Sequence, residues 1–185
     1  MKHKKSFDPA VLAQRIYKAR GRLYKRIRNK SAIERYLISV RSRDDFVAFY
    51  KVRLQKKHAG QLYRYLLRHM AFETCPTITT ALRTINGITS SIELSQASKV
   101  IASLNRKKPV YDSVVRRHLK LSHPGGDLKR AIEIYAQLLE RMSALLREAD
   151  VSKAIREFNR EFPQFSRTIF LTKMKKLDLL LWQLK

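Results

Sequence analysis

Asp112 is the residue of this sequence whose setting best suits chemistry. It stands in the stretch PVYDSVVRRHLKL, and it is the only acidic residue between Glu93 and Asp127, an interval rich in Lys and Arg. A fixed carboxylate among cations can stabilise a positive charge that develops in a reaction, or activate a water molecule. An Asp before a helix is also a common N-cap, since its side chain accepts hydrogen bonds from the first free amides. Both interpretations of Asp112 follow from its position.

The segments around Asp112 carry helical periodicity, and strand alternation is hard to find. The clearest period covers residues 128–148, with Asp127 as its N-cap, and a helix is also expected over 94–104. The leucine-rich segment 171–184 predicts a terminal helix that is almost entirely buried. The predicted fold class is therefore all-α, a compact multi-helix array.

Boundaries elsewhere are predicted from Asp, Pro and Gly. Asp8-Pro9 is a typical helix start, and Gly21 and Gly60 are candidate interruptions of the helices that contain them. A short helix is expected to begin near Thr79 and to end at Asn86-Gly87. Apolar stripes predict two further helices, over 33–40 and 42–54.

The charge of the chain points to a polyanionic partner. Its 185 residues hold 40 Lys and Arg against 15 Asp and Glu, a formal net charge of +25. Phosphate neutralisation rewards many cations at once, so nucleic acid is the expected partner. An anionic membrane surface, an acidic protein and a generally basic surface without a specific partner are the alternatives.

Cysteine and hydropathy limit the remaining classes. With Cys75 as the single cysteine, a disulfide framework and a multi-cysteine zinc or iron–sulfur site are excluded, and the five His residues lack metal-ligand spacing. We therefore expect no metal and no cofactor. No apolar run reaches membrane-spanning length, and the N-terminus does not resemble a secretory signal. The expected location is intracellular, in the cytoplasm or the nucleoid.

One stretch of the chain resembles a known family. Residues 89–117, TSSIELSQASKVIASLNRKKPVYDSVVRR, resemble the core of the helix-hairpin-helix DNA glycosylase superfamily, in which a hairpin of the form LPGVGxKTA is followed by an Asp in a motif like VDTHVxRV. Ala97 matches the last Ala of the hairpin, and Asp112 lies fifteen residues later. The terminal FLTKMKKLDLLLWQLK also resembles the closing helix of small uncharacterised relatives. The resemblance covers roughly residues 80–122 and the last fifteen or so.

This resemblance implies a two-lobed helical fold and base-excision repair chemistry. Asp112 would be the catalytic carboxylate of a hydrolase that cleaves the N-glycosidic bond of a flipped base. Ser95 stands at the position of the lyase lysine, so no imine step is expected, with Lys99 as the only nearby substitute. Ser91 and Glu93 stand where the family has glycine, which puts the phosphate-binding hairpin amides in doubt.

Cationic and aromatic residues complete the predicted site. Tyr111 and Trp182 are candidates for stacking on the extruded base. The predicted division of the chain is a basic N-terminal helical lobe, 1–75, and a lobe with the degenerate hairpin, 76–185, packed as one unit, with Cys75-Pro76-Thr77 at the boundary. The candidate nucleic-acid-binding residues are Arg22, Lys25, Arg26, Lys56, Lys57, Lys99, Arg106, Lys107, Lys108, Arg116 and Arg117.

Two functional hypotheses follow. The first is a monofunctional DNA glycosylase with Asp112 at the mouth of a cleft. The second is a basic DNA- or RNA-binding module on a glycosylase-like all-α scaffold without catalysis, in which Asp112 is a helix cap. The hairpin without glycines favours the second hypothesis.

Overall fold

The computed structural model describes residues 7–28, 56–163 and 171–184, and the side chains of 26–28 and 56 are outside that description. Within these ranges the regular elements are all helices, which confirms the predicted all-α class. The predicted helices over 33–40 and 42–54 lie outside the described residues. The described helices are α1 (Pro9–Arg28), α4 (Lys56–Ala71), α5 (Ile78–Thr89), α6 (Leu94–Leu104), α7 (Ser113–His118), α8 (Leu128–Arg147), α9 (Ala149–Glu161) and α11 (Lys173–Gln183).

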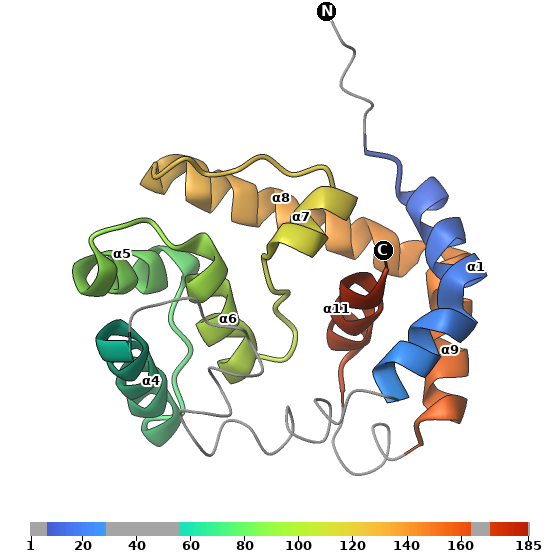
Figure 1. Cartoon of the computed structure of the whole chain (residues 1–185), viewed down its shortest axis with the longest axis horizontal. Helices are drawn as coiled ribbons and strands as arrows, with labels where there is room; N and C mark the ends of the chain where they lie inside the picture. Colours follow the sequence, from blue (N-terminus) through green and yellow to red (C-terminus); the bar gives the residue numbers. More distant parts are fainter. Residues whose placement is uncertain (1–6, 29–55, 164–170, 185) are drawn as a thin grey trace, which may run out of the picture.

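The helices form two groups that α8 and α11 connect. In Figure 1, α4, α5 and α6 pack together on one side, and α1 pairs with α9 on the other. α8 runs across the top and contacts both α5 and α1. α11 lies in the middle, where it contacts α1, α7, α8 and α9. The segment that contains α7 and the C-terminal helix α11 are therefore neighbours through the α7–α11 contact.

A single hydrophobic core runs through both groups. It includes Ile16 of α1, Leu62 of α4, Leu82 of α5, Leu138 of α8 and Leu180 of α11, each with no exposed surface. Burial of apolar surface of this extent is the main stabilising contribution in a domain of this size. The N-terminal helices share this core with the rest of the chain. α1 packs against α9 and α11, and α4 packs against α5 and α6. The division at residue 75 stays a prediction.

α11 is buried almost throughout, as its leucine-rich sequence predicts. From Met174 to Leu181 every residue is buried, including the charged Lys175, Lys176 and Asp178. Thr172 caps the helix by accepting a hydrogen bond from the Lys175 amide, 3.2 Å away. A helix whose whole circumference is covered must satisfy its charged groups inside the protein, because transfer of an unpaired charge from water is costly.

Asp residues cap the helices where the sequence indicates, and the glycine predictions are wrong. Asp8 accepts hydrogen bonds from the amides of Ala10 and Val11, and Asp127 accepts one from Arg130. α1 and α4 continue without a break through Gly21 and Gly60, and α5 continues through Gly87 to Thr89. A glycine costs a helix only about 1 kcal/mol relative to alanine. Packing of the apolar face offsets that cost, as the fully buried Leu82 and Ile85 of α5 illustrate.

Among the described helices, none combines the length and the apolar composition that a membrane crossing requires.

Candidate functional site

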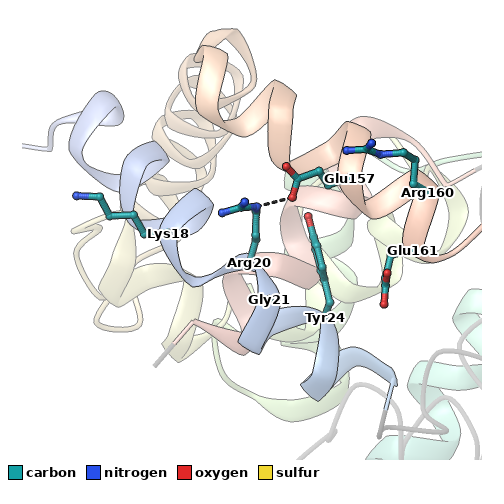
Figure 2. A pocket seen from close by; sticks show the side chains of 7 residues that line it. All are labelled: Lys18, Arg20, Gly21, Tyr24, Glu157, Arg160 and Glu161. Atoms are coloured by element: carbon teal, nitrogen blue, oxygen red, sulfur yellow. Dashed lines mark hydrogen bonds and ion pairs between the residues drawn. The ribbon is translucent and has the colours of Figure 1, made fainter.

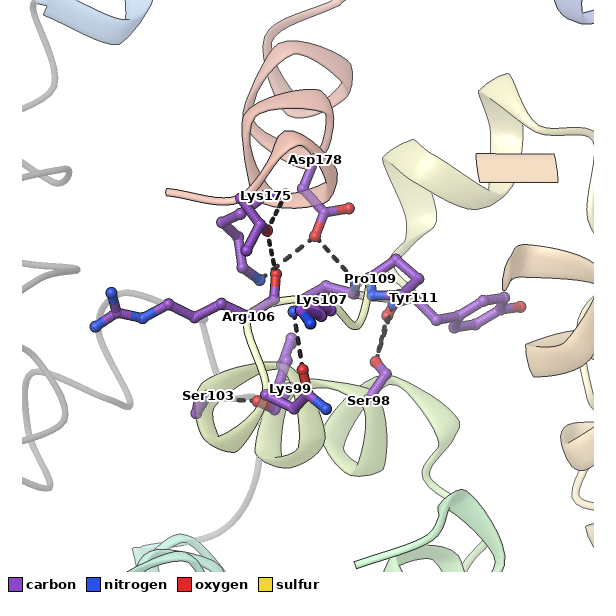
Figure 3. A network of polar contacts seen from close by, with 12 residues as sticks. Ser98, Lys99, Ser103, Arg106, Lys107, Pro109, Tyr111, Lys175 and Asp178 are labelled. Carbon is purple, nitrogen blue, oxygen red and sulfur yellow. Dashed lines mark hydrogen bonds and ion pairs between the residues drawn. The ribbon is translucent and has the colours of Figure 1, made fainter. Parts of the chain in front are cut away.

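The segment that leads to Asp112 is held by three helices. It follows α6 and runs through Pro109, Val110 and Tyr111 to the start of α7. The Tyr111 amide donates to Ser98 Oγ of α6 at 2.9 Å, and the Val110 amide donates to Asp178 Oδ2 of α11 at 3.2 Å. On the α8 side, the Tyr135 hydroxyl donates to the Pro109 carbonyl at 3.4 Å. These contacts, most of which Figure 3 draws, fix the backbone just before Asp112.

Asp112 is the N-cap of α7, and only one of its carboxylate oxygens is used for capping. Oδ1 accepts from the amides of Val114 at 2.9 Å and Val115 at 2.7 Å. Within the described part of the chain Oδ2 has no hydrogen-bond partner, and the residue as a whole is half-buried. Desolvation raises the pKa of Asp112 above its ordinary value, and the two amides and nearby cations oppose that rise. The side chain is therefore both a cap and a desolvated carboxylate whose second oxygen has no hydrogen-bond partner among the described residues.

Two basic side chains act on Asp112 from neighbouring helices. The charges of Lys99 on α6 and His118 on α7 both lower the pKa of Asp112, in opposition to desolvation. Lys99 is only 6% exposed, so the phosphate contact predicted for it would require its side chain to move outward. His118 Nε2 lies within hydrogen-bond distance of the Leu184 carbonyl, and burial lowers the pKa of the imidazole. The carboxylate, the lysine and the histidine thus form a compact polar cluster.

A second carboxylate, Asp178, is close enough to Asp112 for the charge of Asp112 to raise its pKa. Its Oδ2 is 3.4 Å from Lys175 Nζ, and the two side chains are 1% and 2% exposed, while Oδ1 is buried without a hydrogen-bond partner. Desolvation raises the pKa of Asp178 to about 7, although Lys175 and the Val110 amide lower it. The chemical role of this pair is structural, since it ties α11 to the segment before Asp112 (Figure 3).

The turn between α5 and α6 has the topology of a helical hairpin but not the surface of a phosphate site. Four residues, 90–93, connect the helices, and Ser90 has a left-handed backbone with φ of 57°. Ser91 Oγ donates to Glu93 Oε1 at 3.0 Å, which places a carboxylate at the turn. A phosphate that approached the turn amides would meet this negative charge. The geometry agrees with the doubt that the missing glycines raise, and Ser95 is half-buried at the start of α6.

The predicted cations occupy separate surfaces. Arg106 and Lys107 are exposed and Lys108 is half-buried on the turn after α6, and Thr172 Oγ1 donates to the Arg106 carbonyl, so the start of α11 adjoins this turn. Arg116 is half-buried and Arg117 exposed on α7. Of the other cations predicted to bind nucleic acid, Arg22 and Lys25 of α1 and Lys57 of α4 are exposed. The side chains of Arg26 and Lys56 lie outside the described residues.

Neither predicted stacking residue offers an open ring. Tyr111 is 4% exposed, and its hydroxyl donates to the Ser122 carbonyl at 2.8 Å. Trp182 is half-buried and packs against the hydrophobic core. Both side chains pack into the core of the fold. Base stacking by Tyr111 would require local opening of that core.

A groove between α1 and α9 is the feature that the sequence interpretation missed. It has a volume of about 510 Å³ and contains an ion pair of Arg20 with Glu157 (Figure 2). The Arg20 guanidinium also lies 3.9 Å from the centre of the Tyr17 ring. Because Glu157 and Glu161 line the groove together with the cations, it does not suit a polyanion. Residues so far apart in sequence leave no local signal that would predict their meeting.

Within the described residues no three His, Cys, Asp or Glu side chains gather as a metal site. Comparison with protein-family models, with curated proteins and with solved structures found no match.

Proposed function

We propose that this protein binds nucleic acid, with the turn after α6 as part of the contact surface. The observation that carries the proposal is the net charge of +25 together with the exposed Arg106 and Lys107 on a turn that the rest of the fold holds in place. Each cation that neutralises a phosphate releases a condensed counterion, so binding grows with the number of contacts and falls with salt. A rigid turn supports such contacts with little ordering cost.

The test is the salt dependence of binding to a labelled duplex and a labelled single strand, followed by fluorescence anisotropy. We expect log affinity to fall linearly with log salt concentration. The variant Arg106→Gln/Lys107→Gln should lower the slope by about 1 to 2, one for each lost phosphate contact. The matched control Lys129→Gln/Arg130→Gln removes the same charge from the exposed first turn of α8. Equal effects of the two variants would contradict a contact surface at the turn, and absence of binding by the unaltered protein would contradict the function.

A specific observation favours a second function, the hydrolysis of an N-glycosidic bond by Asp112. Oδ1 is used for capping, while Oδ2 has no hydrogen-bond partner within the described residues, on a carboxylate that the fold has partly desolvated. In the proposed reaction the bond between the base and the deoxyribose C1′ breaks, the base leaves with the bonding electrons, and Oδ2 stabilises the positive charge on the sugar. A water molecule that gives its proton to the carboxylate then adds to C1′. Because Ser95 cannot form an imine, the product is an abasic site with an intact strand.

An Asp-to-Asn change at a helix N-cap separates catalysis by Asp112 from its capping role. Asn caps a helix about as well as Asp, so Asp112→Asn keeps the fold and removes the charge. Asp127→Asn makes the same change at the N-cap of α8. With duplexes that carry alkylated, deaminated or oxidised bases, followed by alkali, we expect cleavage by the unaltered protein and by Asp127→Asn, and none by Asp112→Asn. No cleavage across the panel, with nucleic-acid binding unchanged by Asp112→Asn, would leave the binding module as the function.

A further inference from the structure

Phe72 is the most exposed of the large hydrophobic residues that the structure describes. Its side chain is 70% exposed at the end of α4, and Leu67 and Met70 in the last turns of the same helix are 40% and 41% exposed. A single exposed aliphatic side chain is ordinary, but a phenylalanine with most of its surface in water gives up the free energy that burial would provide. The position of Phe72 therefore calls for a partner that covers its ring.

The backbone around Phe72 is fixed by several hydrogen bonds. The Thr74 amide donates to the His69 carbonyl at 2.9 Å and the Glu73 amide donates to the Met70 carbonyl at 3.2 Å, the pattern of a Schellman helix end. His69 Nδ1 and Thr74 Oγ1 are also 2.6 Å apart. Glu73 has φ of 50°, a left-handed conformation that is costly for any residue with a Cβ. A strained, well-bonded turn holds Phe72 at a defined place on the surface, which is what a binding residue needs.

Cations line the same face of α4. Arg64, Arg68 and Phe72 are spaced four residues apart and are all exposed, so they form one stripe along the helix, about 6 Å per step. Lys108, on the turn after α6, is also near this helix end, because its charge opposes the desolvation that raises the pKa of the Cys75 thiol, three residues after Phe72. Figure 1 shows the end of α4 and the turn after α6 at the same lower edge of the protein. The exposed ring thus stands beside the cations of α4, and the acidic Glu73 follows it in the turn.

We propose that Phe72 is a stacking platform for an unpaired base of a nucleic-acid strand whose phosphates lie along Arg64 and Arg68. This inference deepens the proposed nucleic-acid binding and rests on it. An aromatic face among cations combines the two attractions that unpaired strands offer, base stacking and phosphate charge. In a duplex the bases are stacked on one another, so the same ring adds little. The charge of the stripe favours a polyanion over a second copy of this chain, which carries the same net positive charge.

The experiment compares variants of Phe72 by anisotropy with a labelled oligothymidine and a labelled blunt duplex of equal length. Phe72→Ala should weaken binding of the oligothymidine about 5- to 100-fold and leave the duplex nearly unchanged. Phe72→Leu, which keeps an apolar side chain without a ring, should lose nearly as much, and Phe72→Trp should retain the affinity. Val11→Ala is the matched control, because Val11 is 64% exposed on α1, in the other helix group. The salt slope should stay constant in all four variants and fall in Arg64→Gln/Arg68→Gln.

Three outcomes would overturn the inference, and they are distinguishable. If the unaltered protein binds neither polymer, the proposed function and the stacking site fall together. If it binds both and Phe72→Ala changes neither affinity, the stacking site alone is wrong. In that second case, a self-association in sedimentation that Phe72→Ala abolishes would identify the patch as a protein-docking surface. If Phe72→Leu binds oligothymidine as well as the unaltered protein, an apolar contact and not ring stacking holds the strand, and the stacking site is again wrong.

Discussion

Replacement of Asp178 by Asn should change how the stability of this protein depends on pH. Asp178 is completely buried, its Oδ1 has no hydrogen-bond partner, and its Oδ2 interacts with the Val110 amide and with Lys175 Nζ. Burial raises its pKa from the ordinary value of 3.8 to about 7. Asn has nearly the same shape and keeps an oxygen for the Val110 amide, but it does not titrate.

The size and sign of the effect follow from proton linkage. A carboxyl whose pKa is higher in the folded protein binds its proton more tightly there, so its contribution to stability is complete below the unfolded pKa and is lost as pH rises through the folded pKa. A change from 3.8 to about 7 corresponds to about 4 kcal/mol, at about 1.4 kcal/mol per pKa unit. Relative to Asp178→Asn, the unaltered protein should therefore lose about 4 kcal/mol of unfolding free energy between pH 4 and pH 8.

Urea unfolding of the two proteins at pH 4, 5, 6, 7 and 8 measures this difference directly. The charged neighbours of Asp178 are the same in both proteins. Lys175 pairs with it, and the charge of Asp112 raises its pKa. Burial raises the pKa of Tyr135 far above this pH range. Their contributions largely cancel in the difference. A difference that does not vary with pH would refute the raised pKa. A difference that moves in favour of the unaltered protein as pH rises would show that attraction by Lys175 outweighs desolvation.

Three further predictions concern the turn, the cap and the core. Glu73→Gly should stabilise the protein by about 1 kcal/mol in urea unfolding, because glycine adopts positive φ without strain, whereas Glu73→Ala, which keeps a Cβ, should not. Asp112→Ala should cost about 0.5–2 kcal/mol through loss of the α7 cap, and a similar cost for Asp112→Asn would exclude capping as the cause. Phe158→Ala should cost about 3–5 kcal/mol, because the ring is fully buried against Tyr24 and Phe162, and a loss below about 1 kcal/mol would contradict the packing around it.

The fold was predictable where local signals and packing agree. The structure contains the helix that the period over 128–148 and the Asp127 cap predict. It also contains the terminal helix predicted from the leucine-rich segment 171–184. The predicted end at Asn86-Gly87 was wrong because a turn signal is weak compared with tertiary packing. The buried Ile85 holds the helix in place next to these residues, and the left-handed turn that ends it falls at Ser90.

The candidate site was only partly predictable. Asp112 as a helix start followed from its neighbours, but the desolvation of its carboxylate and the burial of Lys99 depend on how the surrounding helices meet. The exposed ring of Phe72 carries one local signal, a large apolar residue at a helix end before a polar turn. That signal does not distinguish a buried side chain from an exposed one, because the distinction depends on which helix covers the position.

By itself, the sequence determined the helical class, the caps and the strongly cationic character, since periodicity, capping and net charge are properties of neighbouring residues or of composition. Only the tertiary structure decided that Asp178 meets the segment before Asp112, and that Arg64, Arg68 and Phe72 face the solvent together. The physical reason is that desolvation and charge proximity depend on distances in space, and contacts between residues such as Val110 and Asp178 are fixed only when distant helices pack.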